Sequence, residues 1–127
     1  MMRCEADLEE KAEKLAVHAY VQANCHLRFE AYRKEVGLTS ASALLTLLIL
    51  REIELRLLQP SAGLAATQEA RSSKVSAYVL AEHAERFRSH VDALGRSNSD
   101  CAAELIEREL DERWLKAVLN VTPEVQQ

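Results

Sequence analysis

The chain has 127 residues, of which 48% are hydrophobic and 28% are charged, and its formal net charge at pH 7 is −4. This composition is typical of one compact folded domain, and it excludes disordered and collagen-like chains. The longest apolar stretch, Ala43–Leu50, is too short to cross a bilayer, and Met1–Cys4 is followed by acidic residues rather than by the apolar segment of a signal peptide. Composition alone selects no function.

The cysteines indicate the cellular compartment. Cys4, Cys25 and Cys101 are odd in number and lie far apart in the sequence. This pattern fits reduced thiols in the cytoplasm better than a disulfide framework or a zinc site. We therefore expect a cytoplasmic protein that holds no metal and no other cofactor.

The first half of the chain predicts an acidic arm, a strand and two helices. Residues 1–13 form the arm, and residues 14–58 carry apolar positions that first alternate and then recur every three or four residues. Gly37 supplies the left-handed residue that commonly ends a helix, Thr39 or Ser40 caps the next helix, and Pro60 stops it. The apolar positions are Val17, Ala19 and Val21 in the strand, Phe29, Tyr32 and Val36 in the first helix, and most of Ala43–Leu58 in the second.

Residues 59–73 are a linker of small residues. The second half of the chain then predicts one strand and two helices again, in residues 74–118, followed by a tail at 119–127. Polar and apolar residues alternate over Lys74–Val79, as in a half-buried strand. Gly95 ends the first helix, and Ser97 with Asp100 resembles a cap and capping box for the second. The apolar stripes are Ala84, Phe87, Val91 and Leu94 in the first helix, and Leu105, Ile106, Leu110, Trp114 and Val118 in the second.

The two halves are copies of one another. A shift of 58 residues aligns them as far as Gly37 and Gly95, and a shift of 57 aligns them beyond those glycines. Chance would give roughly two or three identities over such a span. The observed identities include Val17/Val75, Ala19/Ala77, Tyr20/Tyr78, Val21/Val79, Phe29/Phe87, Ser40/Ser97, Arg51/Arg108, Glu52/Glu109, Arg56/Arg113 and Leu58/Leu115. Because a lone strand leaves its backbone unpaired, we expect the two strands to pair antiparallel.

The segment K-V-S-A-Y-V, a helix that ends in L-G, then R-S-N-S-D and an amphipathic helix resemble the ribbon-helix-helix family of MetJ/Arc-like DNA-binding proteins. The spacing from the last inward strand residue to the glycine is the same in both halves (Val79 to Gly95 and Val21 to Gly37). Members are normally homodimers, and here the dimer would be fused into one chain, as in the tandem ribbon-helix-helix protein of T-DNA transfer. The resemblance implies a mainly α fold: a tandem pseudo-dimer with a two-stranded antiparallel ribbon and four helices.

The resemblance also implies binding of double-stranded DNA, with the ribbon in the major groove. Outward strand residues would reach base edges, and the N-termini of the second helices would meet phosphates. The base-contact candidates are Lys74, Ser76, Tyr78, His18 and Tyr20, and the phosphate-contact candidates are Ser97, Asn98, Arg96, Thr39 and Ser40. Because the outward residues of the two strands differ, we expect unlike half-sites rather than a palindrome.

Each of these features also has an explanation without DNA. Alternating polar residues can form the wet face of a sheet, the tyrosines can pack on that face, and serine caps need no ligand. His83 and His90 favour partly buried packing over metal binding, because no four-ligand set converges. The net negative charge opposes DNA binding, and the basic patch of Lys14, Arg71, Lys74 and Arg96 is thin.

The second helix of the first copy is apolar on nearly every side. Leu47 and Leu50 stand where the second copy has Glu104 and Glu107. We therefore expect an exposed apolar face near Leu47–Leu58 that self-associates or receives a protein partner, unless residues 1–13 or the linker cover it.

The sequence thus predicts a DNA-binding protein that is not an enzyme, because no nucleophilic or paired-carboxylate set can be assembled from it. By analogy with the family, it would be a small transcriptional regulator or an accessory factor in plasmid or conjugative DNA processing. The alternative is a protein-interaction module that kept the ribbon-helix-helix fold without DNA binding.

Overall fold

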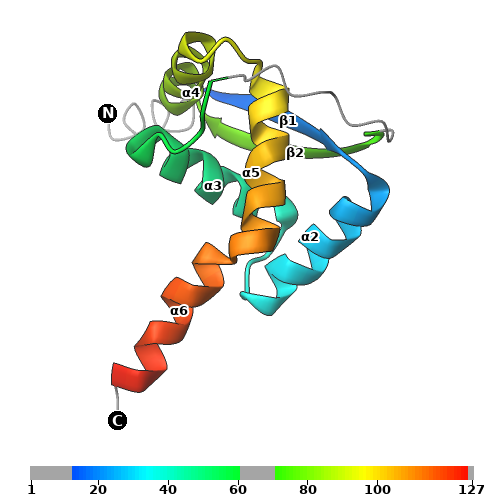
Figure 1. Cartoon of the computed structure of the whole chain (residues 1–127), viewed down its shortest axis with the longest axis vertical. Coiled ribbons are helices and arrows are strands. Elements are labelled where there is room, and N and C mark those ends of the chain that lie inside the picture. Colours follow the sequence, from blue (N-terminus) through cyan, green and yellow to red (C-terminus); the bar gives the residue numbers. More distant parts are fainter. Residues whose placement is uncertain (1–12, 61–70, 126–127) are drawn as a thin grey trace, which may run out of the picture.

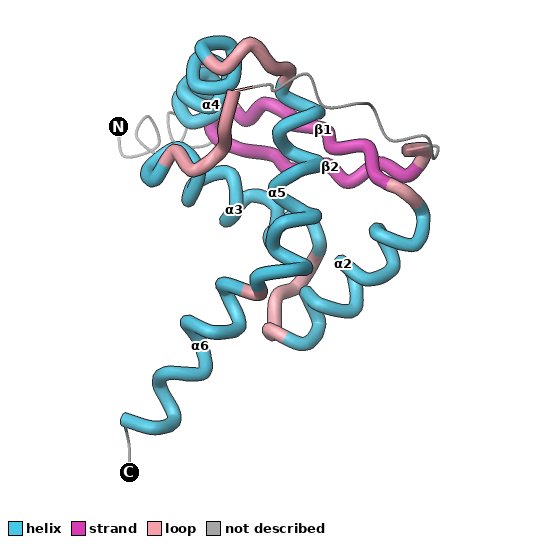
Figure 2. Tube along the Cα trace, viewed as in Figure 1, coloured by secondary structure: helices cyan, strands magenta, loops and turns pink. Residues whose placement is uncertain are grey.

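The computed structural model describes residues 13–60 and 71–125, with side chains as far as residue 119. In this part of the chain, strand β1 (Lys14–Val21) precedes helices α2 (Ala23–Glu35) and α3 (Ala41–Leu55), and strand β2 (Ser73–Leu80) precedes helices α4 (Ala81–Ala93), α5 (Asn98–Glu112) and α6 (Trp114–Val125) (Figures 1 and 2). The expectation of a mainly helical fold with a two-stranded antiparallel sheet is confirmed. There are five described helices where four were expected. Most of the predicted acidic arm, the centre of the linker and the last residues of the tail lie outside the described residues.

The two strands pair antiparallel along their whole length, with Val17 opposite Ala77, His18 opposite Ser76 and Ala19 opposite Val75. The predicted alternation is confirmed, because every second residue is buried from Val17 to Val21 and from Val75 to Val79. Helix α5 packs against β1 and helix α3 against β2, so that one face of the sheet is covered, and Figure 1 shows α5 crossing the strands. The buried strand residues are Val17, Ala19, Val21, Val75, Ala77 and Val79.

The predicted helix ends between the two helices of each half are confirmed. Gly37 and Gly95 have φ values of 85° and 74°, the left-handed region that glycine reaches without strain. Ser40, rather than Thr39, caps α3, because its Oγ accepts a hydrogen bond from the N–H of Ala43 at 3.0 Å. Ser97 caps α5 in the same way.

The predicted extents of the second helices are wrong. Helix α3 ends at Leu55, before Pro60 can act, and α5 ends at Glu112. The next residues, Arg56 and Arg113, both have a left-handed φ of 52°. Trp114 and Val118 therefore belong to α6, which projects from the other helices in Figure 1, and the Val118 side chain is 47% exposed rather than in the core.

Two buried glutamates explain these helix ends. Glu52 and Glu109 are 2% and 1% exposed. The Oε2 of Glu52 accepts a hydrogen bond from the N–H of Leu58 at 2.7 Å, and the Oε2 of Glu109 accepts one from the N–H of Leu115 at 2.8 Å. Each carboxylate therefore binds the backbone N–H of the residue six positions later in the chain. A residue with a left-handed φ just after the helix is needed to turn the chain back toward the carboxylate. We call these two residues the hook glutamates.

Each hook glutamate also contacts the other half of the chain. The Tyr32 hydroxyl of α2 donates to Glu109 Oε2 at 2.5 Å, and His90 Nε2 of α4 lies 2.8 Å from Glu52 Oε2. Tyr32 and His90 occupy the same position of the repeat. Burial, together with the hydrogen bond to Glu109, raises the pKa of Tyr32 to about 12. The two halves are thus joined by a pair of corresponding buried polar contacts.

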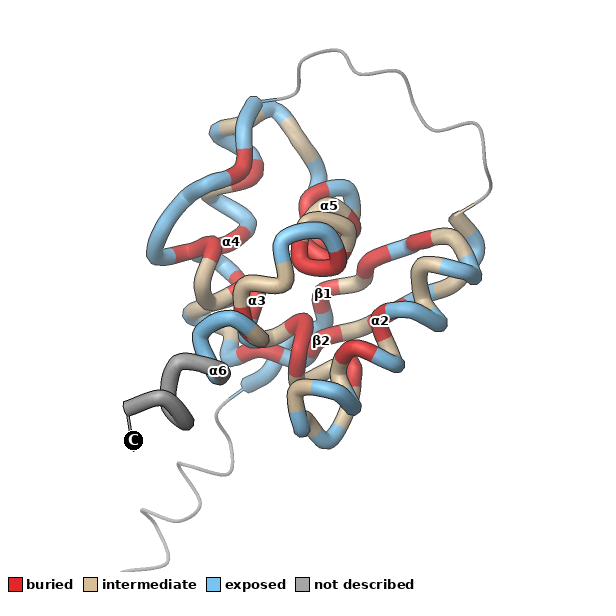
Figure 3. The backbone as a smooth tube through the Cα atoms, turned by 60° about the horizontal axis from the view of Figure 1, so that its bottom comes forward, coloured by how far each residue is buried: buried red, intermediate tan, exposed pale blue. Residues whose placement is uncertain are grey.

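The apolar face predicted on the second helix is only partly exposed. Leu47, Leu55 and Leu57 are 38%, 54% and 40% exposed, but Leu50 is half-buried and packs against the core. In Figure 3 most of α3 is coloured as buried or intermediate, and few of its positions are exposed. The expectation is therefore wrong for Leu50, because this side chain packs against the hydrophobic core. Within the described ranges, no helix combines the length and the apolar character that a membrane crossing needs.

Candidate nucleic-acid interface

The face of the sheet opposite the helices carries all five base-contact candidates. Its central pair is His18 and Ser76, whose Nδ1 and Oγ atoms lie 2.7 Å apart, within hydrogen-bonding distance. On one side of this pair Tyr20 stands opposite Lys74, and on the other Tyr78 stands opposite Ala16. The structure therefore brings these candidates together on one surface, which we call the ribbon face.

The ribbon face is accessible and carries only positive charge. Tyr20 and Tyr78 are 42% and 56% exposed, and Lys74 is exposed. Neither β1 nor β2 contains an aspartate or a glutamate. An extended flat surface with exposed phenols and lysine amines can donate hydrogen bonds to base edges or phosphates.

The register adds a residue pair that the sequence reasoning did not place among the candidates. Lys14 stands opposite Leu80 at the end of the ribbon face, beyond Ala16 and Tyr78. Lys14 is exposed and Leu80 is 39% exposed. The sequence already placed Lys14 in the basic patch, and continuing the alternation by one further pair would have added Leu80. Lys14 and Lys74 therefore place charge toward opposite ends of the face.

The start of α3 carries the candidates Thr39 and Ser40. Thr39 is exposed, and Ser40 uses its side chain as the helix cap. No acidic residue lies in the first turn of α3. The partial positive charge of this helix end is thus not neutralised by a carboxylate within that turn.

The start of α5 differs, because its arginine is already used inside the protein. The Arg96 side chain is only 9% exposed, and its guanidinium contacts Asp100 at 2.8 Å, Glu104 at 2.6 Å and the carbonyl oxygen of Gln59 at 3.1 Å. Burial by itself lowers the pKa of Arg96, but the hydrogen bonds to Asp100 and Glu104 outweigh it and raise the pKa above its ordinary value. Sequence spacing alone does not show this pairing.

The other candidates at this helix end are also partly engaged. Ser97 accepts a hydrogen bond from the N–H of Asp100 at 3.1 Å, and the acidic side chain of Asp100 lies in the first turn. Asn98 is half-buried, and its Oδ1 is buried without a hydrogen-bond partner in the described part of the chain. A phosphate at this end would meet the carboxylate of Asp100, so the start of α3 is the more favourable of the two for an anion.

In the described part of the chain, the cysteines and histidines form no further site. Burial raises the pKa of the Cys101 thiol to about 11 and also raises that of Cys25, and both thiols are free. His90 is bound to Glu52, and His83 is half-buried. No group of three or more His, Cys, Asp or Glu side chains among the residues described could hold a metal ion. Cys4 lies outside these residues.

Comparisons of the chain with protein-family models, with curated proteins and with solved structures find no match.

Proposed function

We propose that the chain is a tandem ribbon-helix-helix pseudo-dimer. The strand register supports this, because His18 pairs with Ser76, which is its own equivalent after the 58-residue shift. Such self-pairing is the pattern of a twofold axis through the centre of a ribbon. The corresponding contacts of the two hook glutamates with Tyr32 and His90 support the same axis.

We further propose that this protein is not an enzyme and that it binds double-stranded DNA with sequence selectivity through the ribbon face. The observation that carries the proposal is an accessible two-stranded ribbon without a carboxylate, with a lysine toward each end and an exposed tyrosine on each strand. The major groove of B-DNA is wide enough to admit such a ribbon. By analogy with the family, the role is transcriptional regulation or plasmid and conjugative DNA processing.

The residues have distinct roles in this proposal. Lys74 donates to guanine O6 or N7, and the two tyrosines and the His18–Ser76 pair contact neighbouring base edges. The N-terminus of α3 contacts a phosphate beside the ribbon. Arg96 remains in its internal contacts and orients the start of α5 rather than reaching the DNA.

The charge of the chain sets the expected strength of binding. Few cations lie on the ribbon face, and the whole chain carries a net charge of −4. Because each neutralised phosphate steepens the salt dependence, we expect a shallow decrease of affinity with salt, with a slope corresponding to about two to four phosphate contacts.

The direct test is selection of binding sites from random duplex DNA at low salt, followed by affinity measurements on the selected sequence. Lys74→Ala and Tyr78→Ala should each weaken binding to that sequence about tenfold or more, since a good base contact is worth about 1–3 kcal/mol. Lys116→Ala is the matched control, because Lys116 lies at the start of α6 and pairs with Glu35. No enrichment of any sequence, or equal effects of Lys74→Ala and Lys116→Ala, would contradict the proposal.

The second candidate is a protein-interaction module. It is favoured by the exposed leucines of the α3 end and by the apolar side chains Val118 and Leu119 of α6, which are 47% and 45% exposed. Light scattering at two concentrations tests it with Leu47→Glu, which is better suited than a change at the half-buried Leu50. An oligomer that Leu47→Glu dissociates, together with no DNA enrichment, would favour this candidate.

A further inference from the structure

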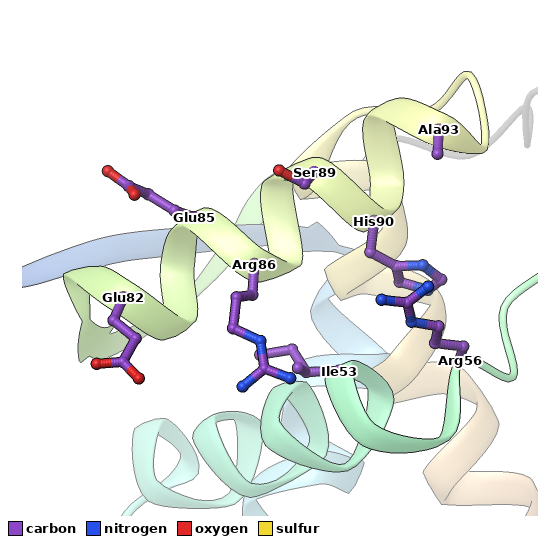
Figure 4. Close-up of a pocket in the computed structure, with 8 residues that line it drawn as sticks. All are labelled: Ile53, Arg56, Glu82, Glu85, Arg86, Ser89, His90 and Ala93. Carbon is purple, nitrogen blue, oxygen red and sulfur yellow. The ribbon is translucent and has the colours of Figure 1, made fainter.

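A groove between α3 and α4 has no part in the ribbon face. It has a volume of about 570 Å³, which is within the usual range for small-molecule sites. Its floor is the apolar side chain of Ile53, and Figure 4 shows Arg56, Arg86 and His90 reaching into the space between the two helices. Ser89 and Ala93 of α4 complete this part of the lining.

The groove presents cations whose charge is largely unused. Arg56 is exposed and forms no ion pair or hydrogen bond through its guanidinium with any described residue. Arg86 lies 3.8 Å from Glu54, and both side chains are at least half exposed, so this pair is weak. Two glutamates of α4 also line the groove, but in Figure 4 Glu85 points away from α3 and Glu82 lies at the end far from Arg56.

The internal repeat supplies a comparison for Arg56. Its equivalent, Arg113, also follows a hook glutamate with a φ of 52°, and its Nη2 donates to Glu35 Oε2 at 2.7 Å. Hydrogen bonds from Lys116 and Arg113 lower the pKa of Glu35, so this carboxylate is charged at neutral pH. In this half of the molecule, the carboxylate of Glu35 therefore lies beside Arg113. We call this arrangement the filled site.

The other half lacks that carboxylate. Glu35 is the last residue of α2, and its equivalent at the end of α4 is Ala93. The aromatic ring of Tyr32, which lies 5.0 Å below Arg113, corresponds to the imidazole of His90. The groove therefore has the arginine, an aromatic ring and the helix end of the filled site. The methyl group of Ala93 stands where the filled site has its anion, and Gln59 stands at the position of Lys116, which also pairs with that anion.

We propose that this groove binds a small organic carboxylate, whose carboxylate group takes beside Arg56 the place that Glu35 takes beside Arg113. A guanidinium and a carboxylate form the strongest type of planar, charge-assisted hydrogen-bond pair. The remainder of the ligand lies along Ile53 toward Arg86, with the Ser89 hydroxyl and the edge of His90 as polar contacts. This inference does not depend on DNA binding.

The test is an NMR titration of backbone amides with butyrate, with glutarate and with inorganic phosphate, at constant ionic strength maintained with chloride. We expect butyrate or glutarate to give saturable shifts confined to residues 53–56 and 82–93. Arg56→Gln should weaken binding at least tenfold. Ala93→Glu should do the same, because it restores the internal carboxylate and fills the site.

Arg113→Gln is the matched control, because it removes the equivalent arginine from the filled site and should leave the titration unchanged. Any one of three results would overturn the proposal. The first is an absence of saturable chemical-shift changes with either carboxylate, the second is undiminished binding to the Ala93→Glu variant, and the third is saturation by phosphate at a lower concentration than by either carboxylate.

Discussion

The Tyr32 hydroxyl is the clearest single test of how the two halves are held together. Its oxygen donates to Glu109 Oε2 at 2.5 Å and accepts a hydrogen bond from the N–H of Lys116 at 3.1 Å. Tyr32→Phe removes both contacts without changing the ring. Among the described residues, Glu109, which is 1% exposed, then keeps only the N–H of Leu115 as a donor.

The cost follows from the kind of contact that is lost. A hydrogen bond to a buried charged acceptor contributes about 1.5–3 kcal/mol, whereas the bond from the N–H of Lys116 is only part-buried, so its loss adds less. We therefore expect Tyr32→Phe to lower the free energy of unfolding by about 2 kcal/mol, which moves the urea midpoint by on the order of 1 M for a protein of this size.

Equilibrium urea unfolding measures this effect, and Tyr20→Phe is the matched control. The Tyr20 hydroxyl is on the exposed ribbon face, so its removal should change the stability by less than about 0.5 kcal/mol. If Tyr32→Phe costs no more than Tyr20→Phe, the hook glutamates do not hold the halves together in the manner described.

Three further predictions follow from local geometry. Tyr32 loses its proton near pH 10 in the unfolded protein but near pH 12 in the folded protein. Its contribution to stability is therefore complete below pH 10 and is lost as the pH rises toward 12. The urea midpoint should accordingly fall less steeply with rising pH in Tyr32→Phe than in the unaltered protein. Gly95→Ala should destabilise by about 1–2 kcal/mol in urea, because φ is 74° and open space around the added methyl group leaves backbone strain as the only cost. Cys101 is fully buried and has a raised thiol pKa, so it should react with iodoacetamide only in the unfolded protein. The half-buried Cys25 should react slowly in the native protein. Alkylation of Cys101 in the native protein, located by mass spectrometry, would refute this.

Local patterns in the sequence predicted the elements that local physics controls. Alternation identified which strand residues are buried, because the side chains of a strand point to opposite faces in turn. Gly37 and Gly95 marked helix ends because few other residues adopt a left-handed backbone at low cost. The antiparallel pairing followed from the duplication, since neither strand has another partner in the described chain.

The helix ends after the hook glutamates could not be predicted in this way. Arg56 and Arg113 have no intrinsic preference for a left-handed φ, and the apolar pattern continues through both positions. The turn exists because a buried carboxylate accepts an N–H six residues on, which is a tertiary effect. One signal was present: glutamate, arginine and leucine recur with identical spacing in both halves, as Glu52, Arg56 and Leu58 and as Glu109, Arg113 and Leu115.

For a related reason, the sequence predicted where some residues of the candidate interface lie but not where others do. Residues of the ribbon face follow from strand alternation, so the sequence grouped His18, Ser76 and Tyr78 on one surface. Arg96 was chosen for its charge and its place before a helix. Its burial against Asp100 and Glu104 depends on side-chain packing that charge and position do not reveal.

The two halves of the chain differ in ways that two identical subunits could not. The central pair of the ribbon face joins a histidine to a serine, and the first turn of α5 contains Asp100 where that of α3 contains Ala43. The start of α3 is therefore more favourable for an anion than the start of α5, and the two strands carry different side chains on the ribbon face.

If the ribbon face binds DNA, the preferred sequence should consequently consist of unlike half-sites, and the half-site beside α3 should show the stronger interference from phosphate ethylation. Asp100→Ala should reduce that difference between the half-sites, because it makes the two helix starts alike. Selection of a perfect palindrome, or equal interference on both sides in the unaltered protein, would mean that the divergence of the two halves serves something other than DNA recognition.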